Sequence, residues 1–322
     1  MPRDTFSAAL ESLRGQNASL DEMLNIVSKM YTIKTQVQAN VDMHFVTSYP
    51  PGHFYSPLPD REEVERVALR IYGDPPPDTL PGIHLQEARQ LELVERLSKY
   101  YKNLPYADHK RDNWRYYYRN PAFSYADAIW LYSMLREFTP GRIIEVGSGF
   151  SSCVMLDTAE KFLRSQPEMI FIDPYPQRLY DAMGASIPVF VRVMPQEVQS
   201  VPLEIFETLE DGDILFLDSS HVGKIGSDLL HLLFAVLPRL KRGVLVHFHD
   251  IFYPFEYPLD WVKGGCAWNE NYFIRAFLQY NDAFEILLFG DFLGKKHPAL
   301  LRKFTPLCLK NTGGSLWLRK NK

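Results

Sequence analysis

The sequence contains little cysteine, and the positions of its cysteines exclude two classes of small fold. The three residues, Cys153, Cys266 and Cys308, lie far apart and form no CxxC pair. That spacing argues against a disulfide framework and against a structural zinc site. It suits a reducing compartment, which favours a cytoplasmic protein.

Long apolar runs and an excess of basic charge are also missing. The most apolar stretches, such as 229–237, are far shorter than the roughly 20 residues that cross a bilayer. No apolar run near the first residues marks a signal peptide. The 35 basic and 39 acidic residues give a net charge of −4, which is a poor basis for binding a phosphate backbone. We therefore expect a cytoplasmic protein that binds neither membrane nor nucleic acid.

Residues 1–125 have the pattern of helices separated by proline-rich breaks. The expected helices lie at 20–37, 60–72 and 85–101, and the breaks lie at 49–60 and 73–82. Asp60 has the position of an N-cap, with Glu63 three residues later. The region is too apolar and aromatic for a disordered tail. We expect it to form a helical cap that narrows a pocket and offers a surface on which a homodimer can form.

Residues 126–322 show short apolar runs that alternate with helical stretches. Strand-like runs lie at 142–146, 169–173, 189–193, 213–218, 243–249, 283–289 and 315–319. The helical stretches lie at 151–163, 177–183, 203–209, 225–240 and 269–280. Apolar strands that alternate with helices indicate an α/β fold with a parallel sheet covered on both faces.

A glycine loop follows the first of these strands. In the sequence IIEVGSGFSS, Glu145 ends the strand, Gly147 and Gly149 follow, and a helix starts at once. Glycines allow a sharp turn and a close approach of the backbone to a ligand at the helix N-terminus. Asp173 ends the next strand, where a carboxylate can accept hydrogen bonds from ribose hydroxyls. Ser152 replaces the third glycine of a dinucleotide fingerprint, which disfavours a pyrophosphate ligand.

Aspartates and histidines gather at the ends of the fourth and fifth strands. Asp218 ends the fourth strand, and His249 and Asp250 end the fifth. Both ends border the crevice in which open α/β sheets bind ligands. Carboxylates and an imidazole that meet there favour a divalent-metal site. His247 lies one step deeper in the strand, and we interpret it as a core histidine.

Together these motifs resemble class I S-adenosylmethionine (SAM)-dependent methyltransferases. E-x-G-x-G, followed by an acid after the second strand, is similar to their first two motifs. The segment 217–251, with DSSH and HFHD, is similar to a bacterial branch related to catechol O-methyltransferase, macrolide-sugar O-methyltransferases and cephalosporin hydroxylase-like proteins. The resemblance implies a Rossmann-like sheet of seven strands whose last two form an antiparallel hairpin. It also implies that 126–322 is the SAM-binding domain.

The resemblance further implies roles for individual residues. The predicted SAM-binding residues are Glu145, Gly147, Gly149, Ser151 and Asp173, with Gln196 near the adenine and Tyr125 near the methionine part. In catechol O-methyltransferase-like enzymes, an acid after strand four and an acid–amide pair after strand five hold a metal. Those positions carry Asp218, His249 and Asp250 here, and the histidine leaves Mg²⁺, Mn²⁺, Fe²⁺ and Zn²⁺ open. Relatives place a general base at the position of His221, so we predict that His221 and Asp218 are catalytic.

Two aromatic segments have less specific interpretations. The segment 114–128 interleaves arginines with aromatics, and we interpret it as a lid and core-packing segment rather than an RNA-stacking surface. The irregular segment 52–59 is either a substrate lid or a surface loop.

We expect a SAM-dependent methyltransferase that methylates a hydroxyl of a small polar acceptor, such as a sugar or natural product, with metal assistance. Three alternatives stay open. They are an enzyme that transfers or cyclises the aminocarboxypropyl arm of SAM, a metal-dependent hydroxylase of the cephalosporin type, and a non-catalytic SAM-binding module.

Overall fold

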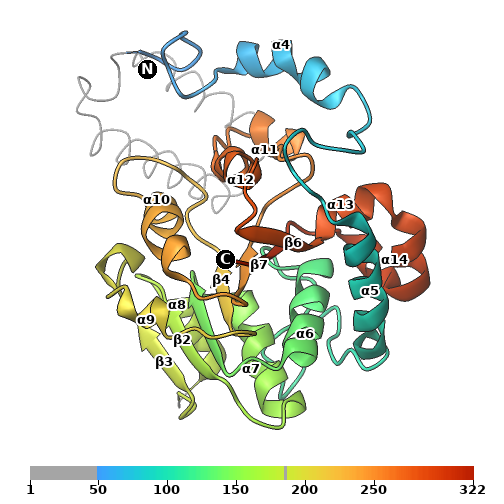
Figure 1. The fold of residues 1–322 in the computed structure, drawn as a ribbon, viewed down its shortest axis with the longest axis vertical. Coiled ribbons are helices and arrows are strands. Elements are labelled where there is room, and N and C mark those ends of the chain that lie inside the picture. The colour runs from blue at the N-terminus through green and yellow to red at the C-terminus, as the bar shows by residue number, and fades with distance from the viewer. Residues whose placement is uncertain (1–48, 185–186) are drawn as a thin grey trace, which may run out of the picture. The chain divides into compact units, whose positions relative to one another are not determined.

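The computed structural model describes residues 49–184 and 187–322, and Val67–Lys322 form one compact unit that contains the sheet (Figure 1). The helix predicted at 20–37 lies outside the described residues. None of the described helices is long and apolar enough to cross a membrane.

Seven strands form one sheet in the order β3-β2-β1-β4-β5-β7-β6. Their bounds are β1 Arg142–Val146, β2 Glu168–Ile172, β3 Val191–Met194, β4 Ile214–Leu217, β5 Leu245–Phe248, β6 Phe284–Phe289 and β7 Leu316–Lys320. Strands β1 to β5 run parallel, whereas β7 pairs antiparallel with both β5 and β6. The apolar central strands are buried, as strands covered on both faces require. This confirms the predicted sheet and its terminal antiparallel hairpin.

Several of the described helices were expected. Their bounds are α4 Arg61–Tyr72, α5 Glu87–Tyr101, α6 Ala126–Phe138, α7 Phe150–Phe162, α8 Gln177–Met183, α9 Glu204–Glu207, α10 Asp228–His231, α11 Leu259–Lys263, α12 Glu270–Leu278, α13 Gly290–Lys296 and α14 Pro298–Phe304. Helix α5 packs on α6 and β6, and α6 packs on α7 (Figure 1). The predicted cap of α4 is confirmed, because a side-chain oxygen of Asp60 accepts a hydrogen bond from the amide of Glu63 at 2.7 Å.

The helix predicted at 225–240 is interrupted. Helix α10 ends at His231, a π-helical turn covers Leu232–Val236, and a 3₁₀ turn covers Leu237–Arg239. Pro238 lies within the last turn, and it has no amide hydrogen for an α-helical bond and crowds the preceding turn. The regular spacing of apolar residues gave no sign of this change. Helices α13 and α14, between the last two strands, were not predicted.

The aromatic segment before α6 is part of the core. Tyr116, Tyr118 and Phe123 are at most 2% exposed. The guanidinium of Arg115 contacts Asp157 at 3.0 Å and Glu160 at 2.7 Å. The rings are therefore buried and this arginine is neutralised, which confirms the core-packing interpretation of 114–128.

Candidate active site at the ends of β1, β2, β4 and β5

The loop after β1 depends on a glycine. Gly147 has a φ of 84°, and a Cβ placed on it would lie 1.9 Å from the carbonyl oxygen of Asp218. The left-handed backbone favours glycine, and the contact leaves no room for a side chain. Gly147 therefore allows the ends of β1 and β4 to approach each other.

Glu145, a predicted cofactor residue, is fully buried in β1. Its carboxyl group accepts hydrogen bonds from the hydroxyls of Ser151 and Ser152 at the start of α7. Burial raises the pKa of Glu145 to about 8, because the charged form loses its solvation, and the two hydroxyls oppose that rise. Glu145 and Ser151 thus connect α7 to the sheet by a hydrogen bond. Neither residue lines either of the two cavities of the described chain that have Asp218 in their walls.

Asp173 organises the glycine loop from the end of β2. One carboxylate oxygen accepts hydrogen bonds from the amide of Ser148 at 2.9 Å and from its hydroxyl at 2.7 Å. The other oxygen accepts from the amide of Tyr175 at 2.7 Å. Beside them lies a cavity of about 570 Å³, which we call the cofactor cavity. Its lining includes Gly147, Ser148, Asp173, Gln199, Asp218 and Asp228.

Three other predicted cofactor residues lie outside that lining. Gly149 precedes α7, and its amide donates to the hydroxyl of Ser152 at 2.9 Å. Tyr125 stacks on the ring of Tyr118 at 5.0 Å between centroids. Gln196 donates to the carbonyl of Ser200 at 3.2 Å, while its neighbours 197–199 line the cavity. The structure thus brings Gly147 and Asp173 to the cofactor cavity and places these three in the surrounding framework.

A second cavity, of about 910 Å³, also has Asp218 in its wall, and we call it the acceptor cavity. Its polar lining includes Asn120, Ser124, Arg178, His221, His249 and Asp250. Its aromatic lining consists of Phe252, Trp261 and Trp268, whose neighbouring rings lie 5.3 and 5.7 Å apart between centroids. Both cavities have the size of ordinary small-molecule sites, about 300–1,000 Å³. Asp218 is common to the two linings, so the cavities adjoin at the end of β4.

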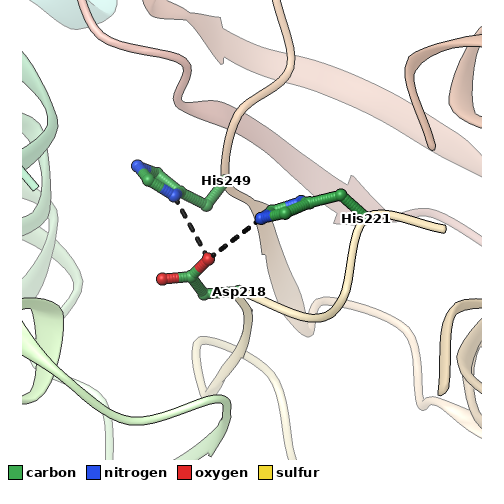
Figure 2. Close-up of side chains that lie close together, drawn as sticks. All are labelled: Asp218, His221 and His249. Atoms are coloured by element: carbon green, nitrogen blue, oxygen red, sulfur yellow. Dashed lines mark hydrogen bonds and ion pairs between the residues drawn. The ribbon is translucent and has the colours of Figure 1, made fainter. Parts of the chain in front are cut away.

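Two imidazoles face Asp218 in the acceptor cavity (Figure 2). The Oδ1 of Asp218 lies 3.2 Å from the Nδ1 of His249 and 3.4 Å from the Nε2 of His221. The Oδ2 of Asp250 lies 3.7 Å from each of the same two nitrogens. The predicted group of Asp218, His249 and Asp250 is therefore brought together, and His221 joins it through a nitrogen at comparable distances.

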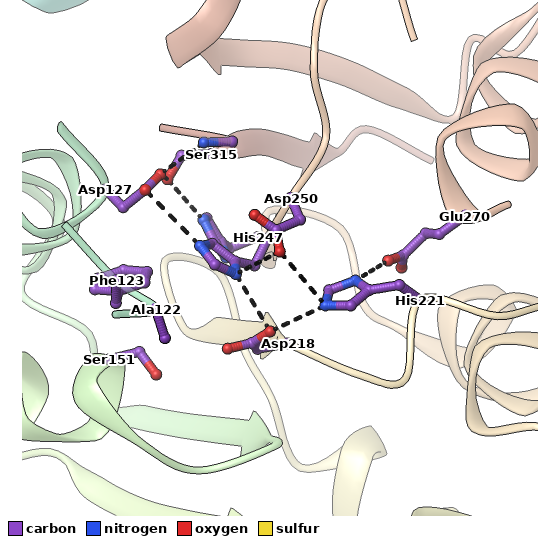
Figure 3. Close-up of polar contacts among 12 residues, drawn as sticks. Ala122, Phe123, Asp127, Ser151, Asp218, His221, His247, Asp250, Glu270 and Ser315 are labelled. Carbon is purple, nitrogen blue, oxygen red and sulfur yellow. Dashed lines mark hydrogen bonds and ion pairs between the residues drawn. The ribbon is translucent and has the colours of Figure 1, made fainter. Parts of the chain in front are cut away.

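The outer nitrogen of each imidazole faces a buried carboxylate (Figure 3). The Nδ1 of His221 is 2.7 Å from Glu270, and the Nε2 of His249 is 3.8 Å from Asp127. Asp127 also accepts hydrogen bonds from the Ser315 hydroxyl at 2.7 Å and from the Gly314 amide at 3.0 Å. Glu270 and Asp127 are 2% and 3% exposed. The His221 ring is thus oriented by Glu270, which lies outside the acceptor cavity, whereas Asp127 belongs to the lining of that cavity and is too far from His249 for a hydrogen bond.

The charges of the cluster act strongly on one another. Burial alone would lower the pKa of His221, but the neighbouring carboxylates of Asp218 and Glu270 raise it to about 10. Burial also opposes the charged form of His249, yet Asp250 and Asp218 raise its pKa well above the usual range. Burial raises the pKa of Asp250. The acids outnumber the two imidazoles, so the cluster attracts a cation.

Backbone strain coincides with this cluster. His221 and Asp250 have φ values of 61° and 57°, although neither is glycine. Such conformations each cost on the order of 1–3 kcal/mol and gather at functional sites. A Cβ on Gly314 would lie 2.6 Å from the Cα of Asp250, so this glycine lets β7 approach the turn after β5.

His247 is a core residue, as expected. Its ring stacks on Phe216 at 3.9 Å between centroids, and its Nε2 lies 3.1 Å from the Ser315 hydroxyl. Burial lowers the pKa of His247 well below the usual range, and the charge of His249 adds to this effect. Sequence reasoning missed Glu270, and it gave Asp127 and Gly314 no role at this cluster, placing Asp127 only in a segment expected near the methionine part of SAM. None of them stands in a motif, and only the fold brings them to the cluster.

The comparisons with known proteins agree with these motifs. A family model described as a methyltransferase domain matches residues 144–251. An uncharacterized protein of Archaeoglobus fulgidus is 34% identical over 177 residues, which are 54% of this chain and 80% of that protein.

Solved methyltransferases are similar at low identity. The SAM-bound O-methyltransferase TomG from Streptomyces achromogenes is 13% identical, with a TM-score of 0.39 over 82% of this chain and 99% of its own. The SAH-bound Podospora anserina methyltransferase PaMTH1 is 15% identical, with a TM-score of 0.38 over 81% of this chain and 96% of its own. The methyltransferase domain matches the same residues that carry the strand-end motifs, and the archaeal relative is similar over more than half of the chain. The chain therefore belongs to the class I SAM-dependent methyltransferases.

Proposed function

We propose that this chain transfers the methyl group of SAM to a hydroxyl of a small polar acceptor, such as a sugar or natural product, with the help of a divalent ion. The observation that carries the proposal is that Asp218 lines both cavities. A cofactor in the first cavity and an acceptor in the second would meet at this residue. Alignment of two reactants in this way is worth about 7–11 kcal/mol of a reaction barrier.

The cofactor cavity has the groups that SAM requires. Asp173 would accept hydrogen bonds from the ribose hydroxyls, and it is itself fixed by Ser148 and Tyr175. Gly147 would lie against the ligand without a side chain in the way. When bound, SAM supplies a methyl group that is already activated by its positive sulfur, so the protein has to align it and prepare the nucleophile.

The acceptor cavity supports a ring-shaped acceptor with hydroxyl groups. Trp261, Trp268 and Phe252 offer apolar faces, while Ser124 and Arg178 offer hydrogen-bonding groups. Residues 120–124 come from the end of the predicted N-terminal cap, 1–125. We propose that this part of the cap closes one wall of the cavity and selects the acceptor.

An alcohol hydroxyl needs stronger activation than an ordinary side chain provides. Asp218, His249 and Asp250 would hold a divalent ion, which lowers the pKa of a hydroxyl bound to it. Their donor atoms fit such an ion, because carboxylate oxygens and an imidazole nitrogen converge in a cluster with excess negative charge. The role of general base would need a ring nitrogen of His221 that is free to take a proton. Glu270, Asp218 and Asp250 surround both of its nitrogens, so we propose a different role for it below.

A metal-dependent hydroxylase is a second candidate, and one observation favours it. Asp218, His221 and His249 form a two-histidine, one-carboxylate group, which is the ligand set of many non-haem iron oxygenases. A hydroxylase would require oxygen together with an added two-electron reductant, such as a 2-oxo acid or ascorbate, and would leave SAM unconsumed.

The test is an assay with isotopically methyl-labelled SAM and a panel of sugars, phenols and diols, with and without oxygen. We expect label in an O-methyl product, equal rates without oxygen, and loss of turnover in chelator. Hydroxylated, unlabelled product that forms only with oxygen would contradict methyl transfer. Release of methylthioadenosine without a methylated product would instead indicate chemistry on the aminocarboxypropyl arm.

A further inference from the structure

We propose that His221 is a metal ligand, and that the resulting set of two imidazoles and two carboxylates selects a transition-metal ion of the Zn²⁺, Co²⁺ and Fe²⁺ class over Mg²⁺. This proposal rests on the proposed function only for the position of the metal, and it does not depend on which acceptor is methylated. It concerns the donors of Asp218, His221, His249 and Asp250, all of which line the acceptor cavity.

The spacing of these donors matches coordination better than direct hydrogen bonding. Tetrahedral ligands at about 2.1 Å from a zinc-like ion lie about 3.4 Å from one another. The four nitrogen–oxygen distances in the cluster are 3.2, 3.4, 3.7 and 3.7 Å. Three of these pairs are not hydrogen bonds, so direct bonding does not account for the arrangement. The ligand atoms of Asp218, His221 and His249 all lie within 4.8 Å of one another, as donors around a common centre do. The carboxylate of Asp250 approaches the same two nitrogens from a second side.

The orientation of the rings supports the same assignment. His221 turns one nitrogen toward the cluster and the other toward the buried carboxylate of Glu270 at 2.7 Å, whereas the outer nitrogen of His249 lies 3.8 Å from Asp127, too far for a hydrogen bond. A carboxylate on the outer nitrogen fixes the tautomer and raises the basicity of the nitrogen that faces the metal. Metal-binding histidines almost always have such a partner.

His221 is also held firmly through its backbone. Its carbonyl oxygen accepts hydrogen bonds from the amides of Asn269 and Glu270 at 3.2 and 3.1 Å. The Trp268 ring lies 4.5 Å from the imidazole centroid. A ring fixed on both sides is suited to hold an ion, and it is poorly suited to follow a proton toward an acceptor.

The donor set then determines which ion is preferred. Mg²⁺ prefers oxygen ligands in octahedral geometry and keeps several waters, whereas imidazole suits zinc, copper, iron and nickel. Two of the four donors here are imidazole nitrogens. Zinc-like ions also accept a fifth ligand, so four protein donors leave room for an acceptor hydroxyl.

The experiment uses full-length protein treated with chelator and dialysed, with no SAM and no acceptor present. Calorimetry measures binding of Zn²⁺, Co²⁺ and Mg²⁺, and visible absorption follows Co²⁺. We expect one tight site for Zn²⁺ and Co²⁺, with the intense Co²⁺ bands of four- or five-coordination. A large excess of Mg²⁺ should not displace the Co²⁺.

Three variants test the role of His221. His221→Ala should weaken Co²⁺ binding and shift the remaining bands. Glu270→Gln should lower Co²⁺ affinity about 10- to 100-fold, the usual effect of losing a partner of a ligating histidine. His109→Ala changes an exposed histidine outside the cluster and should have no effect. Thermal unfolding and SAM calorimetry on each variant establish that it is folded.

Two results would overturn the inference. One is Mg²⁺ binding as tight as that of Co²⁺, and the other is an unchanged Co²⁺ spectrum in folded His221→Ala. Methyl transfer is measured separately. Selective Co²⁺ binding without O-methylation would leave the ligand assignment intact and contradict the proposed function. O-methylation that proceeds with Mg²⁺ alone would support the proposed function and contradict the ligand assignment.

Discussion

The two cavities that meet at Asp218 are built in different ways. On the cofactor side, interacting residues are close in the sequence, as Glu145 and Ser151 are, or belong to consecutive strands, as Ser148 and Asp173 do. On the acceptor side, Asp127 interacts with Ser315, and His221 interacts with Glu270. The first side is a local motif that a sequence can reveal. The second is assembled by the fold from segments far apart in the chain.

The comparison implies that the two sides can be disabled separately. Changes on the cofactor side should weaken SAM binding and spare the ion. Changes on the acceptor side should do the opposite. Asp218 is one exception, because it lines both cavities, and Gly147 is another, because it contacts the backbone of Asp218.

The largest effect is therefore expected from Gly147→Ala. Its Cβ would lie 1.9 Å from the Asp218 carbonyl oxygen, so the ends of β1 and β4 must separate. We expect loss of detectable binding of both SAM and Co²⁺ by calorimetry, with a clear fall in melting temperature. Gly212→Ala is the matched control, since Gly212 has a φ of 86° and a Cβ added to it would meet no atom within 4 Å. It should cost only about 1–2 kcal/mol of stability, and an equal loss in both variants would contradict the steric explanation.

Removal of metal should affect only the acceptor side. We expect chelator to lower methyl transfer to a hydroxyl by about 10²-fold or more, since activation by an ion is worth several kcal/mol of barrier. The affinity for SAM should stay the same, because Asp173 and the glycine loop are separate from the donors. Turnover measured before and after Zn²⁺ is restored checks this. Full activity in chelator would contradict the proposal that methyl transfer requires an ion held by the residues of the acceptor side.

A smaller effect, confined to the cofactor side, is expected from Asp173→Ala. A hydrogen bond to a charged group is worth about 1.5–3 kcal/mol, so SAM affinity should fall about 10- to 100-fold. Co²⁺ binding should not change. Asp181→Ala, on the exposed surface of α8, serves as the control. Calorimetry with NAD in place of SAM should show no binding to the wild type.

The smallest effect is expected from His247→Leu. His247 stacks on Phe216 and packs against the tilted ring of Trp317, and among its ring nitrogens only Nε2 has a hydrogen-bond partner in the described residues, the Ser315 hydroxyl. An apolar replacement of similar volume removes that one hydrogen bond, so it should cost only about 1–2 kcal/mol and leave both ligands bound. His249→Leu, two residues along the same chain segment, should abolish Co²⁺ binding. If the two variants behaved alike in the Co²⁺ titration, the assignment of His249 as a ligand would be wrong.

These residues also explain how far the sequence could be interpreted. The alternation of apolar strands and helices was sufficient to predict a parallel sheet covered by helices, because burial on both faces leaves a continuous apolar run. The seven strands and the antiparallel hairpin followed from the resemblance to class I methyltransferases. The glycine loop and Asp173 were visible for a similar reason, since a turn and its acidic partner lie at fixed distances from strand ends. The motif did not reveal that Glu145 faces the helix rather than a cavity, because that depends on Ser151 and Ser152.

The acceptor side could be predicted only in part. Strand ends placed Asp218, His249 and Asp250 together, since β4 and β5 are neighbours in the sheet. The sequence could not show that one ring nitrogen of His221 is hydrogen-bonded to a carboxylate, because that partner, Glu270, lies 49 residues away. The interruption of the helix predicted at 225–240 follows from Pro238, which apolar spacing alone does not take into account. The two helices before β7 depend on packing that residue spacing does not encode.

The structure of the protein crystallised with SAM tests the central claim most directly. We predict that the ribose lies on Asp173, that the sulfur lies near Gly147, and that the methyl group points into the acceptor cavity beside Asp218. A SAM molecule bound elsewhere, or one whose methyl group faces away from Asp218, would contradict the claim that cofactor and acceptor meet there.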